Sequence, residues 1–337
     1  MITNPLGFAA SLHQTTRTRH GWSKALQLAP DLYPGVGGKR FRAAILQEAY
    51  AFAGGRGEAP SLIVDAVEML HAGSLVVDDF EDGSATRRDQ PALHRVVGSA
   101  RAVNAGNWMY FRALELAGHA YADPARSVAM LQRFIEVGRQ CHEGQAIDLA
   151  TRIDEVTPRQ AQATALSISR WKTGRLVSLA AWCGAHAAAG DPDTLRAVAA
   201  FGCRVGICLQ MKNDLDEHVE FVAGADRCDD LRNRRVTWPW AWAADRLPPD
   251  GFASLQRRLA GPHPHPDSLR ALARDLLGET QEPAVRAIST RLRRARDLLA
   301  VSTGGGAGAR RLADVTEFLQ SGGRPPAAQQ PAVEATG

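Results

Sequence analysis

The sequence has no long alternation of polar and apolar residues and no internal repeat. Because half-buried strands show a period of two, the missing alternation excludes a sheet as the main element of the fold. Ala, Leu and Arg are abundant instead, and Gly and Pro fall mostly between runs of helical length. The composition therefore predicts an all-α protein.

Cysteine is scarce as well. The five cysteines are odd in number, form no C-x-x-C pair and lie mostly in apolar helical runs. These features exclude a disulfide framework and a zinc site, and they indicate reduced thiols in the core. The five are Cys141, Cys183, Cys203, Cys208 and Cys228.

A strong charge of one sign and long hydrophobic runs are also missing. The formal net charge is +4, and the arginines are not collected in one basic stripe with interleaved aromatics, so nucleic acid is not an expected partner. No run approaches the roughly 20 apolar residues that span a bilayer, and the N-terminus lacks a basic region followed by an apolar one. We therefore expect a soluble, cytoplasmic protein without stable membrane insertion.

What the sequence does have is an apolar segment that ends in acidic residues. Residues 62–77 leave hardly any polar face, which predicts a buried helix. One stripe of this helix is polar, because its members are spaced i, i+3, i+7 and i+11. They are His71, Ser74, Asp78 and Asp82. Carboxylates at a helix C-terminus repel one another and the helix dipole, so a hard cation such as Mg²⁺ is the expected partner. A solvated acidic helix end is the alternative for such a motif alone.

A second acidic stripe strengthens the first interpretation. Its members follow a largely apolar run, residues 201–211, and are spaced i, i+3, i+4 and i+7, again on one helix face. They are Gln210, Asn213, Asp214 and Glu217. If the two stripes face each other across a helical bundle, they form a site for several divalent ions, as diphosphate chemistry requires.

Cations accompany the acids. A glycine turn, Gly37-Gly38, carries Lys39 and Arg42 just before a helix predicted over residues 43–53, which is typical of an anion site; a plain basic turn is the alternative. Arg87 and Arg88 directly follow the first acidic stripe. Arginine forks suit phosphate, although these two could simply neutralise the acids.

One lysine stands in an apolar helical run. Lys172 would be costly there without an anionic partner, and a lysine that snorkels to the surface is the alternative. This helix is expected to begin at Thr157-Pro158, a strong N-cap and N1 pair. Residues 223–239 are basic, irregular and too polar for the core, so we interpret them as a lid over the site.

The remaining helices are predicted over residues 98–122, 127–150, 193–222 and 309–319. We expect one α-helical domain over residues 1–320. Residues 321–337 are rich in Gly, Pro, Ala and Gln, which predicts a disordered tail.

These motifs, in this order, resemble those of the trans-isoprenyl diphosphate synthases in the polyprenyl synthetase family, over residues 33–240. Residues 37–42 are similar to the family's GGKRxR motif, and the stretch from His71 to Asp82, followed by Arg87-Arg88, is similar to its first aspartate-rich motif. Three further stretches resemble the later signatures of the family. They are Lys172-Thr173, Gln210-x-x-Asn213-Asp214-x-x-Glu217 and Arg235-x-Thr237-x-Pro239. The sequences of residues 78–84 and 104–111 are most similar to those of the short-chain, geranylgeranyl-type branch of the family.

The resemblance implies an isoprenoid-synthase-type helical bundle around a central cavity. It also implies a homodimeric transferase that uses several Mg²⁺ ions to condense an allylic diphosphate with isopentenyl diphosphate. By the same resemblance, the metal ligands are Asp78, Asp82, Asn213, Asp214 and Glu217. The catalytic residues are Asp78, Asp79, Asp82, Arg87, Lys172, Asn213 and Asp214. The substrate-binding residues are Lys39, Arg42, His71, Arg87, Arg88, Lys172, Thr173, Gln210 and Arg235.

Product length in the family depends on residues just before the first acidic motif, where bulky side chains stop a growing chain. Here these positions are Gly73 and Ser74, so the chain can grow past them. Trp108 and Phe111 on the next helix would form a lower floor. The resemblance therefore implies a C20, geranylgeranyl product.

Several positions depart from the family pattern. The second acidic motif has Asn213 and Glu217 where the family has Asp, and Asp89 replaces a glycine after the arginine pair. Arg235 replaces a lysine, and Ala43 replaces a proline. These departures leave two alternatives open. One is a diverged enzyme that prenylates an aromatic or indole acceptor or cyclises the allylic cation, and the other is a non-catalytic subunit of a heteromeric synthase.

Overall fold

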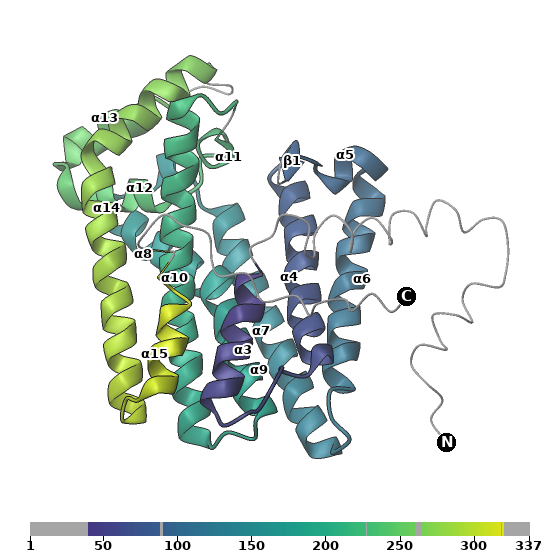
Figure 1. The fold of residues 1–337 in the computed structure, drawn as a ribbon. Helices are drawn as coiled ribbons and strands as arrows, with labels where there is room; N and C mark the ends of the chain where they lie inside the picture. The colour runs from purple at the N-terminus through teal and green to yellow at the C-terminus, as the bar shows by residue number, and fades with distance from the viewer. Residues whose placement is uncertain (1–39, 88–89, 227, 260–264, 318, 320–337) are drawn as a thin grey trace, which may run out of the picture. The chain divides into compact units, whose positions relative to one another are not determined.

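The computed structural model describes residues 40–87, 90–226, 228–259, 265–317 and 319. Helices dominate this part of the chain (Figure 1). Within it the only strands are β1 (Thr86–Arg87) and β2 (Gln90–Pro91), which pair antiparallel with Thr86 opposite Pro91. The prediction of an all-α protein is therefore confirmed.

The chain divides into two compact units. The small unit comprises residues 72–111, and the large unit comprises, in the described chain, residues 40–71 and 112–319. The boundary falls within helices α4 (Ser61–Glu81) and α6 (Ser99–Gly118). That residues 1–320 act as one domain stays a prediction, and the tail of residues 321–337 lies outside the described residues.

In the small unit, the end of α4 packs closely on the start of α6. A Cβ atom added to Gly73 would lie 3.0 Å from the carbonyl oxygen of Gly106 and 3.0 Å from the Cβ of Met109. One added to Gly106 would lie 2.8 Å from Cγ2 of Val77. Each glycine therefore has a packing reason, because a side chain there would push the two helices apart. The unit also contains the β1–β2 hairpin and the short helix α5 (Leu93–Val97).

The large unit is a bundle around α10 (Pro192–Ala223). This helix packs against α9 (Arg175–Ala187) and runs beside α14 (Pro266–Thr303) (Figure 1). Phe201 and Met211 of α10 are buried in this core. The other elements are α3 (Phe41–Phe52), α7 (Pro124–Ala150), η2 (Ile153–Glu155), α8 (Pro158–Ile168), the π-helical turn η3 (Ser169–Gly174), α11 (Asp229–Arg232), α12 (Trp238–Arg246), α13 (Pro249–Arg257) and α15 (Ala307–Asp314).

Local signals explain where these helices begin. Thr157 caps α8 in a capping box with Gln160, and Pro158 is the first helical residue, as the sequence predicted. Asp191 caps α10 through the backbone N–H groups of Asp193 and Thr194. The helix expected to run through Lys172 is continuous from α8 to α9, but it passes through the π turn η3.

The interpretation of residues 223–239 as too polar for the core was wrong. Leu231 is 1% exposed and Val236 is 3% exposed, so this segment is packed into the large unit. Its charges are accommodated by pairing, since Arg232 binds Asp229 at 2.9 Å and Arg234 binds the carboxylate of Asp154 at 2.6 Å. Residues 224–226 are exposed, and the role of this segment as a lid stays a prediction.

All five cysteines are free, with Cys183, Cys208 and Cys228 buried.

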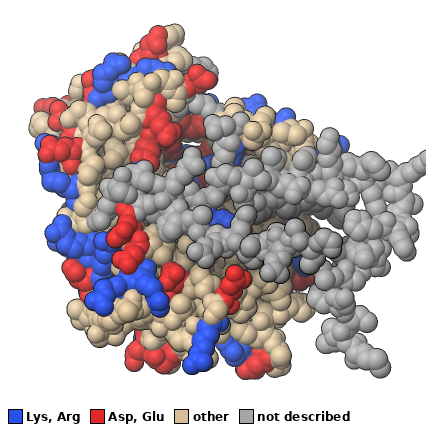
Figure 2. All heavy atoms as spheres, in the orientation of Figure 1, with Lys and Arg blue, Asp and Glu red and all other residues tan. Residues whose placement is uncertain are grey.

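Among the described residues, α10 is long and apolar enough by composition to cross a bilayer, although 44% of that window is buried inside the protein, as in a core helix. On the face seen in Figure 2, acidic and basic side chains lie close together at the left and lower side of the view.

Candidate active site

The predicted site residues belong to both compact units, so each group is described within its own unit. The small unit holds Gly73, Ser74, Asp78, Asp79, Asp82, Arg87 and Trp108. The large unit holds Arg42, His71, Lys172, Thr173, Gln210, Asn213, Asp214, Glu217 and Arg235. Lys39, Arg88 and Asp89 lie outside the described residues.

In the small unit, the first acidic motif separates into two faces. Asp79 is fully buried and accepts a hydrogen bond from Nε of Arg87 at 2.9 Å, as well as an ion pair with the same guanidinium. Its backbone carbonyl also accepts the N–H of Ser84 at 2.9 Å. This pair fastens the β1–β2 hairpin to the end of α4, so Asp79 and Arg87 have a structural role whatever else they do.

Asp78 and Asp82 occupy the other face of the same helix end. They are four residues apart and therefore share one side of the last turn. Both carboxylates are half-buried, whereas Asp79 points inward. This arrangement leaves two carboxylates on one face as candidate metal ligands.

The candidate chain-length residues are also in the small unit. Gly73 faces α6 at the close crossing, and Ser74 is half-buried. Trp108 is 36% exposed and Phe111 is 72% exposed on α6. Their role in product length stays a prediction.

In the large unit, Asp214 is the centre of a buried polar network. It is 4% exposed, and its two carboxylate oxygens accept hydrogen bonds from Nε2 of Gln210 at 2.6 Å and from the backbone N–H of Trp238 at 3.0 Å. Burial raises the pKa of Asp214 to about 7, against these hydrogen bonds, and the charges of Glu217 and Asp148 add to the rise. The network is therefore short of positive charge.

A further carboxylate extends this network. The backbone N–H of Asp230 donates to Oε1 of Glu217 at 3.2 Å. Loss of hydration raises the pKa of Asp230 well above its ordinary value, and the charges of Glu217, Asp214 and Asp148 raise it further. Sequence reasoning missed Asp230 and Asp148 as members of the site, because neither belongs to an acidic stripe of the kind that marked the two motifs.

Asp148, near the end of α7, contacts two cationic side chains, those of Lys172 and Arg235. Nζ of Lys172 lies 2.9 Å from Oδ2 of Asp148, and Nη1 of Arg235 donates to the backbone carbonyl of the same residue at 2.8 Å. Asp148 is thus the anionic partner that the apolar surroundings of Lys172 predicted. Oγ1 of Thr173, the next residue, donates to Oε1 of Gln210 at 2.5 Å, which links the π turn to the Asp214 network.

Arg42 lies in the same region of the large unit. Burial raises the pKa of the Cys141 thiol to about 12, and the positive charges of Arg42, Arg175 and Lys172 oppose the rise, so all three act on one side chain. Cys141 itself donates to the backbone carbonyl of Lys172 at 3.5 Å. Arg42 and His71 are both half-buried.

The donor chemistry of this half-site fits a hard divalent cation. Its ligating groups are carboxylate and amide oxygens, and a bound cation would oppose the rise in the pKa of Asp214 and Asp230 that burial and the neighbouring carboxylates cause. Asn213 is exposed and Glu217 is half-buried. Within either unit, the described residues contain no ready-made group of three His, Cys, Asp or Glu side chains at ion-binding distance.

The described helices thus bring carboxylates, a lysine and arginines together in one buried polar network of the large unit. Residues 24–275, more than half of the chain, match the family model described as polyprenyl synthetase. The chain belongs to the polyprenyl synthetase family.

Individual relatives share part of their length with this chain. It is 29% identical over 195 residues to geranylgeranyl pyrophosphate synthase 2 of Zymoseptoria tritici, covering 57% of this chain and 56% of that protein. It is 30% identical over 206 residues to geranylgeranyl diphosphate synthase of Methanosarcina mazei, covering 60% and 62%. These matches span less than two thirds of either relative.

A solved structure has the same fold. The polyprenyl synthase of Caulobacter crescentus, complexed with calcium and isoprenyl diphosphate, superposes with a TM-score of 0.74 at 23% identity, covering 90% of this chain and 95% of that chain. At this identity the likeness shows the isoprenoid-synthase-type fold and leaves the chemistry to the residues themselves.

Proposed function

We propose that the protein is a Mg²⁺-dependent prenyltransferase that condenses an allylic diphosphate with isopentenyl diphosphate to a C20 prenyl diphosphate. The observation that carries this proposal is the Lys172–Asp148–Arg235 cluster beside the buried Asp214 network. The relatives from Zymoseptoria tritici and Methanosarcina mazei, which carry geranylgeranyl synthase names, support the product class.

The oxygen donors would hold the metal ions. They are Asp78, Asp82, Asn213, Asp214 and Glu217. When bound, Mg²⁺ supplies positive charge that stabilises the departing diphosphate. Burial raises the pKa of Asp214 to about 7, and a bound cation would lower it again, so this carboxyl group would lose its proton as the cation binds.

The chain's cations act on the same leaving group. Lys172 and Arg235, which both contact Asp148, would donate hydrogen bonds to phosphate oxygens as the bond between C1 and the ester oxygen breaks, with its electron pair going to the diphosphate. The double bond of isopentenyl diphosphate then attacks C1, and loss of a proton from the acceptor restores a double bond. Apolar helix walls exclude water, which would otherwise quench the allylic cation.

The acceptor diphosphate would bind Lys39, Arg42, His71 and Arg88. A full set of cations for a second diphosphate favours elongation over cyclisation, because a cyclase has no second diphosphate to hold. Thr173 and Gln210 would align the π turn beneath the substrate through their hydrogen bond.

One observation favours the second candidate, a diverged prenyltransferase or cyclase. Both carboxylate oxygens of Asp214 are engaged within the chain, and its neighbour Asn213 is neutral and exposed. The second metal motif is therefore a weaker ligand set than a pair of adjacent free carboxylates.

Product analysis tests the proposal. Purified protein is incubated with Mg²⁺, farnesyl diphosphate and labelled isopentenyl diphosphate, and the dephosphorylated products are separated by chromatography. Labelled geranylgeraniol is the expected result. Hydrocarbons from the allylic substrate without incorporated label would establish a cyclase, and no diphosphate release under any condition would establish a non-catalytic subunit.

We further propose that the protein is a homodimer. Val128 and Ile135 of α7 are each 52% exposed, and Leu149, two further heptads along, is 38% exposed. Their spacing places them on one stripe of the helix, where a second copy can cover them. Sedimentation equilibrium should show a dimer, with Ile135→Asp shifting it to monomer and Val301→Asp, at an apolar residue 81% exposed on α14, leaving it dimeric. A monomeric wild-type protein would reject this part.

A cytoplasmic location is proposed on the packing of α10. This helix, which is the one in the described chain long and apolar enough to cross a bilayer, packs against α9, α14 and α12 within the large unit and would serve as a core helix. Fractionation should find the protein in the soluble fraction, and extraction from membranes by detergent alone would contradict this.

A further inference from the structure

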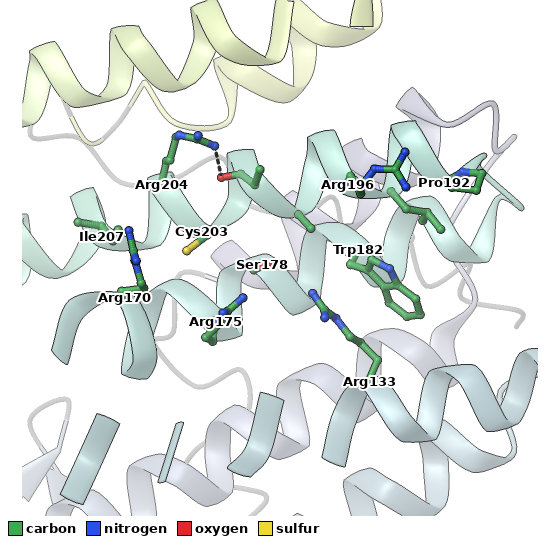
Figure 3. A pocket seen from close by; sticks show the side chains of 13 residues that line it. Arg133, Arg170, Arg175, Ser178, Trp182, Pro192, Arg196, Cys203, Arg204 and Ile207 are labelled. Atoms are coloured by element: carbon green, nitrogen blue, oxygen red, sulfur yellow. Dashed lines mark hydrogen bonds between the residues drawn. The ribbon is translucent and has the colours of Figure 1, made fainter. Parts of the chain in front are cut away.

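A cavity lies in the large unit, between α7, the π turn, α9 and α10 (Figure 3). Its volume is about 590 Å³, within the range of small-molecule sites. We call it the arginine pocket, because five arginines line it. They are Arg133, Arg170, Arg175, Arg196 and Arg204, and no lining residue is Asp or Glu. Trp182, Leu195 and Ile207 provide apolar wall.

Among the described residues, carboxylates neutralise two of these guanidinium groups. Arg133 pairs with Glu136 at 2.9 Å, and Arg196 pairs with Asp193 one helical turn away. In the described part of the chain, no carboxylate pairs with the other three. Arg204 donates only to the carbonyl of Ala200 at 3.1 Å.

Arg175 is held most firmly. Its guanidinium lies 4.9 Å from the ring centroid of Trp171, and its buried Nε has no hydrogen-bond acceptor among the described residues. A buried donor without an acceptor costs free energy, so a ligand acceptor there would be favourable. Arg170 and Arg204 are exposed at the pocket and can close on a ligand.

The three arginines without a carboxylate partner line the pocket together with Cys203. Burial raises the pKa of the Cys203 thiol, and the positive charges of Arg175, Arg170 and Arg204 oppose the rise. Three guanidinium groups in one cavity match the charge of a diphosphate group, which each fork can bind through two oxygens.

The pocket shares its π turn with the candidate active site. In a π-helix the hydrogen bonds join residues five apart, so Arg170 and Arg175 stand about one turn apart on one side. Lys172 and Thr173, between them, face Asp148 and Gln210 instead. A ligand that holds Arg170 and Arg175 would therefore also restrict the conformation of the π turn that contains Lys172.

We propose that the arginine pocket binds the diphosphate group of an organic diphosphate at a site separate from the candidate active site. The guanidinium groups hold the diphosphate, and the wall of Trp182, Leu195 and Ile207 contacts the organic part. His186 already stacks on the Trp182 ring at 4.4 Å, so this tryptophan serves as wall and not as an open stacking platform. The inference does not rest on the proposed catalytic function.

Cysteine alkylation gives a readout at each site in one experiment. Cys203 is half-buried in the arginine pocket, whereas Cys141 is half-buried beside Lys172, and fully buried Cys183 is an internal control for unfolding. Alkylation rates at the three residues are measured by peptide mass spectrometry in EDTA, with inorganic diphosphate, geranylgeranyl diphosphate or ADP added. The variants are R170Q/R204Q and, as a matched control, R196Q, whose charge is already paired by Asp193.

An organic diphosphate should slow alkylation of Cys203 in the wild type and in R196Q. The concentration for half-protection should rise about tenfold or more in R170Q/R204Q, because two charge-assisted contacts are lost. Stronger protection by geranylgeranyl diphosphate identifies an isoprenoid ligand, and stronger protection by ADP identifies a nucleotide.

Three outcomes would overturn the proposal. They are no protection of Cys203 by any probe, equal protection of R170Q/R204Q and wild type, and equal protection by inorganic diphosphate and both esters. Since the readout needs no turnover, it is independent of whether labelled isopentenyl diphosphate is incorporated. A failed proposal on catalysis and a failed proposal on this pocket are thus distinguishable.

Discussion

Lys172 and Asp148 form an ion pair across 2.9 Å, joining the π turn to the end of α7. Their side chains are 25% and 13% exposed, so the pair is largely withdrawn from water. Because the pair is largely shielded from water, the hydrogen bond to the Asp148 carboxylate holds the ammonium group of Lys172 in one position. Asp148 therefore positions the lysine that we expect to meet the leaving diphosphate.

Asp148→Asn should lower kcat/KM for the allylic substrate by about tenfold or more, because Lys172 loses its charged partner and its fixed position. Asp148→Glu should recover part of the loss. The matched control is Asp193→Asn, which breaks an exposed pair with Arg196 and should leave steady-state kinetics unchanged. Equal kinetics for Asp148→Asn and wild type would show that the pair does not position Lys172 for the reaction.

Arg87→Ala should destabilise the protein by about 3 kcal/mol or more, since it leaves the fully buried Asp79 without its charged partner. Urea unfolding measures this loss. Replacing both members, as Asp79→Leu with Arg87→Met, should restore much of the stability because no buried charge remains. If Arg87→Ala keeps its stability within about 0.5 kcal/mol while turnover falls, the pair is catalytic and not structural.

The sequence could predict features that depend on neighbours along the chain. The start of α8 at Thr157-Pro158 followed from capping chemistry, and the buried core of α10 followed from its apolar run. The partner of Lys172 could not be named, because Asp148 lies 24 residues away and is joined to it only by folding. Leu231 and Val236 stand among charged residues in the sequence. Residues 223–239 were therefore interpreted as too polar for the core, although both side chains are buried.

The same limit applies to the candidate site. Spacing predicted both acidic stripes, but it could not show that Asp79 turns inward to Arg87 while Asp78 and Asp82 share the other face. Nor could it reveal the helix crossing that gives Gly73 a packing reason. That the stripes of Asp78 and Asp214 face one cavity stays a prediction.

Asp78→Ala and Asp82→Ala should each nearly abolish turnover, because an anchor for ions that stabilise the leaving group contributes several kcal/mol to the barrier, on the order of a thousandfold in rate. Glu81→Ala is the matched control on the same helix end, where the side chain is exposed on another face. Asn213→Asp should be tolerated. Product formation from farnesyl diphosphate measures all four, and near-normal activity of Asp78→Ala would refute the metal assignment.

The pKa of Asp214 predicts how stability depends on pH when metal is removed. The folded pKa is about 7, above the ordinary value of 3.8, so between these values the folded state binds more protons than the unfolded state. Stability in EDTA should therefore fall as pH rises through this window, by at most about 1.4 kcal/mol per pH unit from this group. His218, whose pKa is lowered by burial, acts in the opposite direction below about pH 6.5.

Comparison with Asp214→Asn isolates the contribution of Asp214, because the amide cannot titrate. Urea unfolding in EDTA from pH 4 to 8 should show a smaller decline in this variant than in wild type. Added Mg²⁺ should stabilise the wild type more at pH 8 than at pH 6, since a proton and a cation compete for the same carboxylate. An Mg²⁺ effect that is the same at both pH values, or the same in Asp214→Asn, would remove Asp214 from the ligand set and leave Asp78 and Asp82 as the candidate anchors.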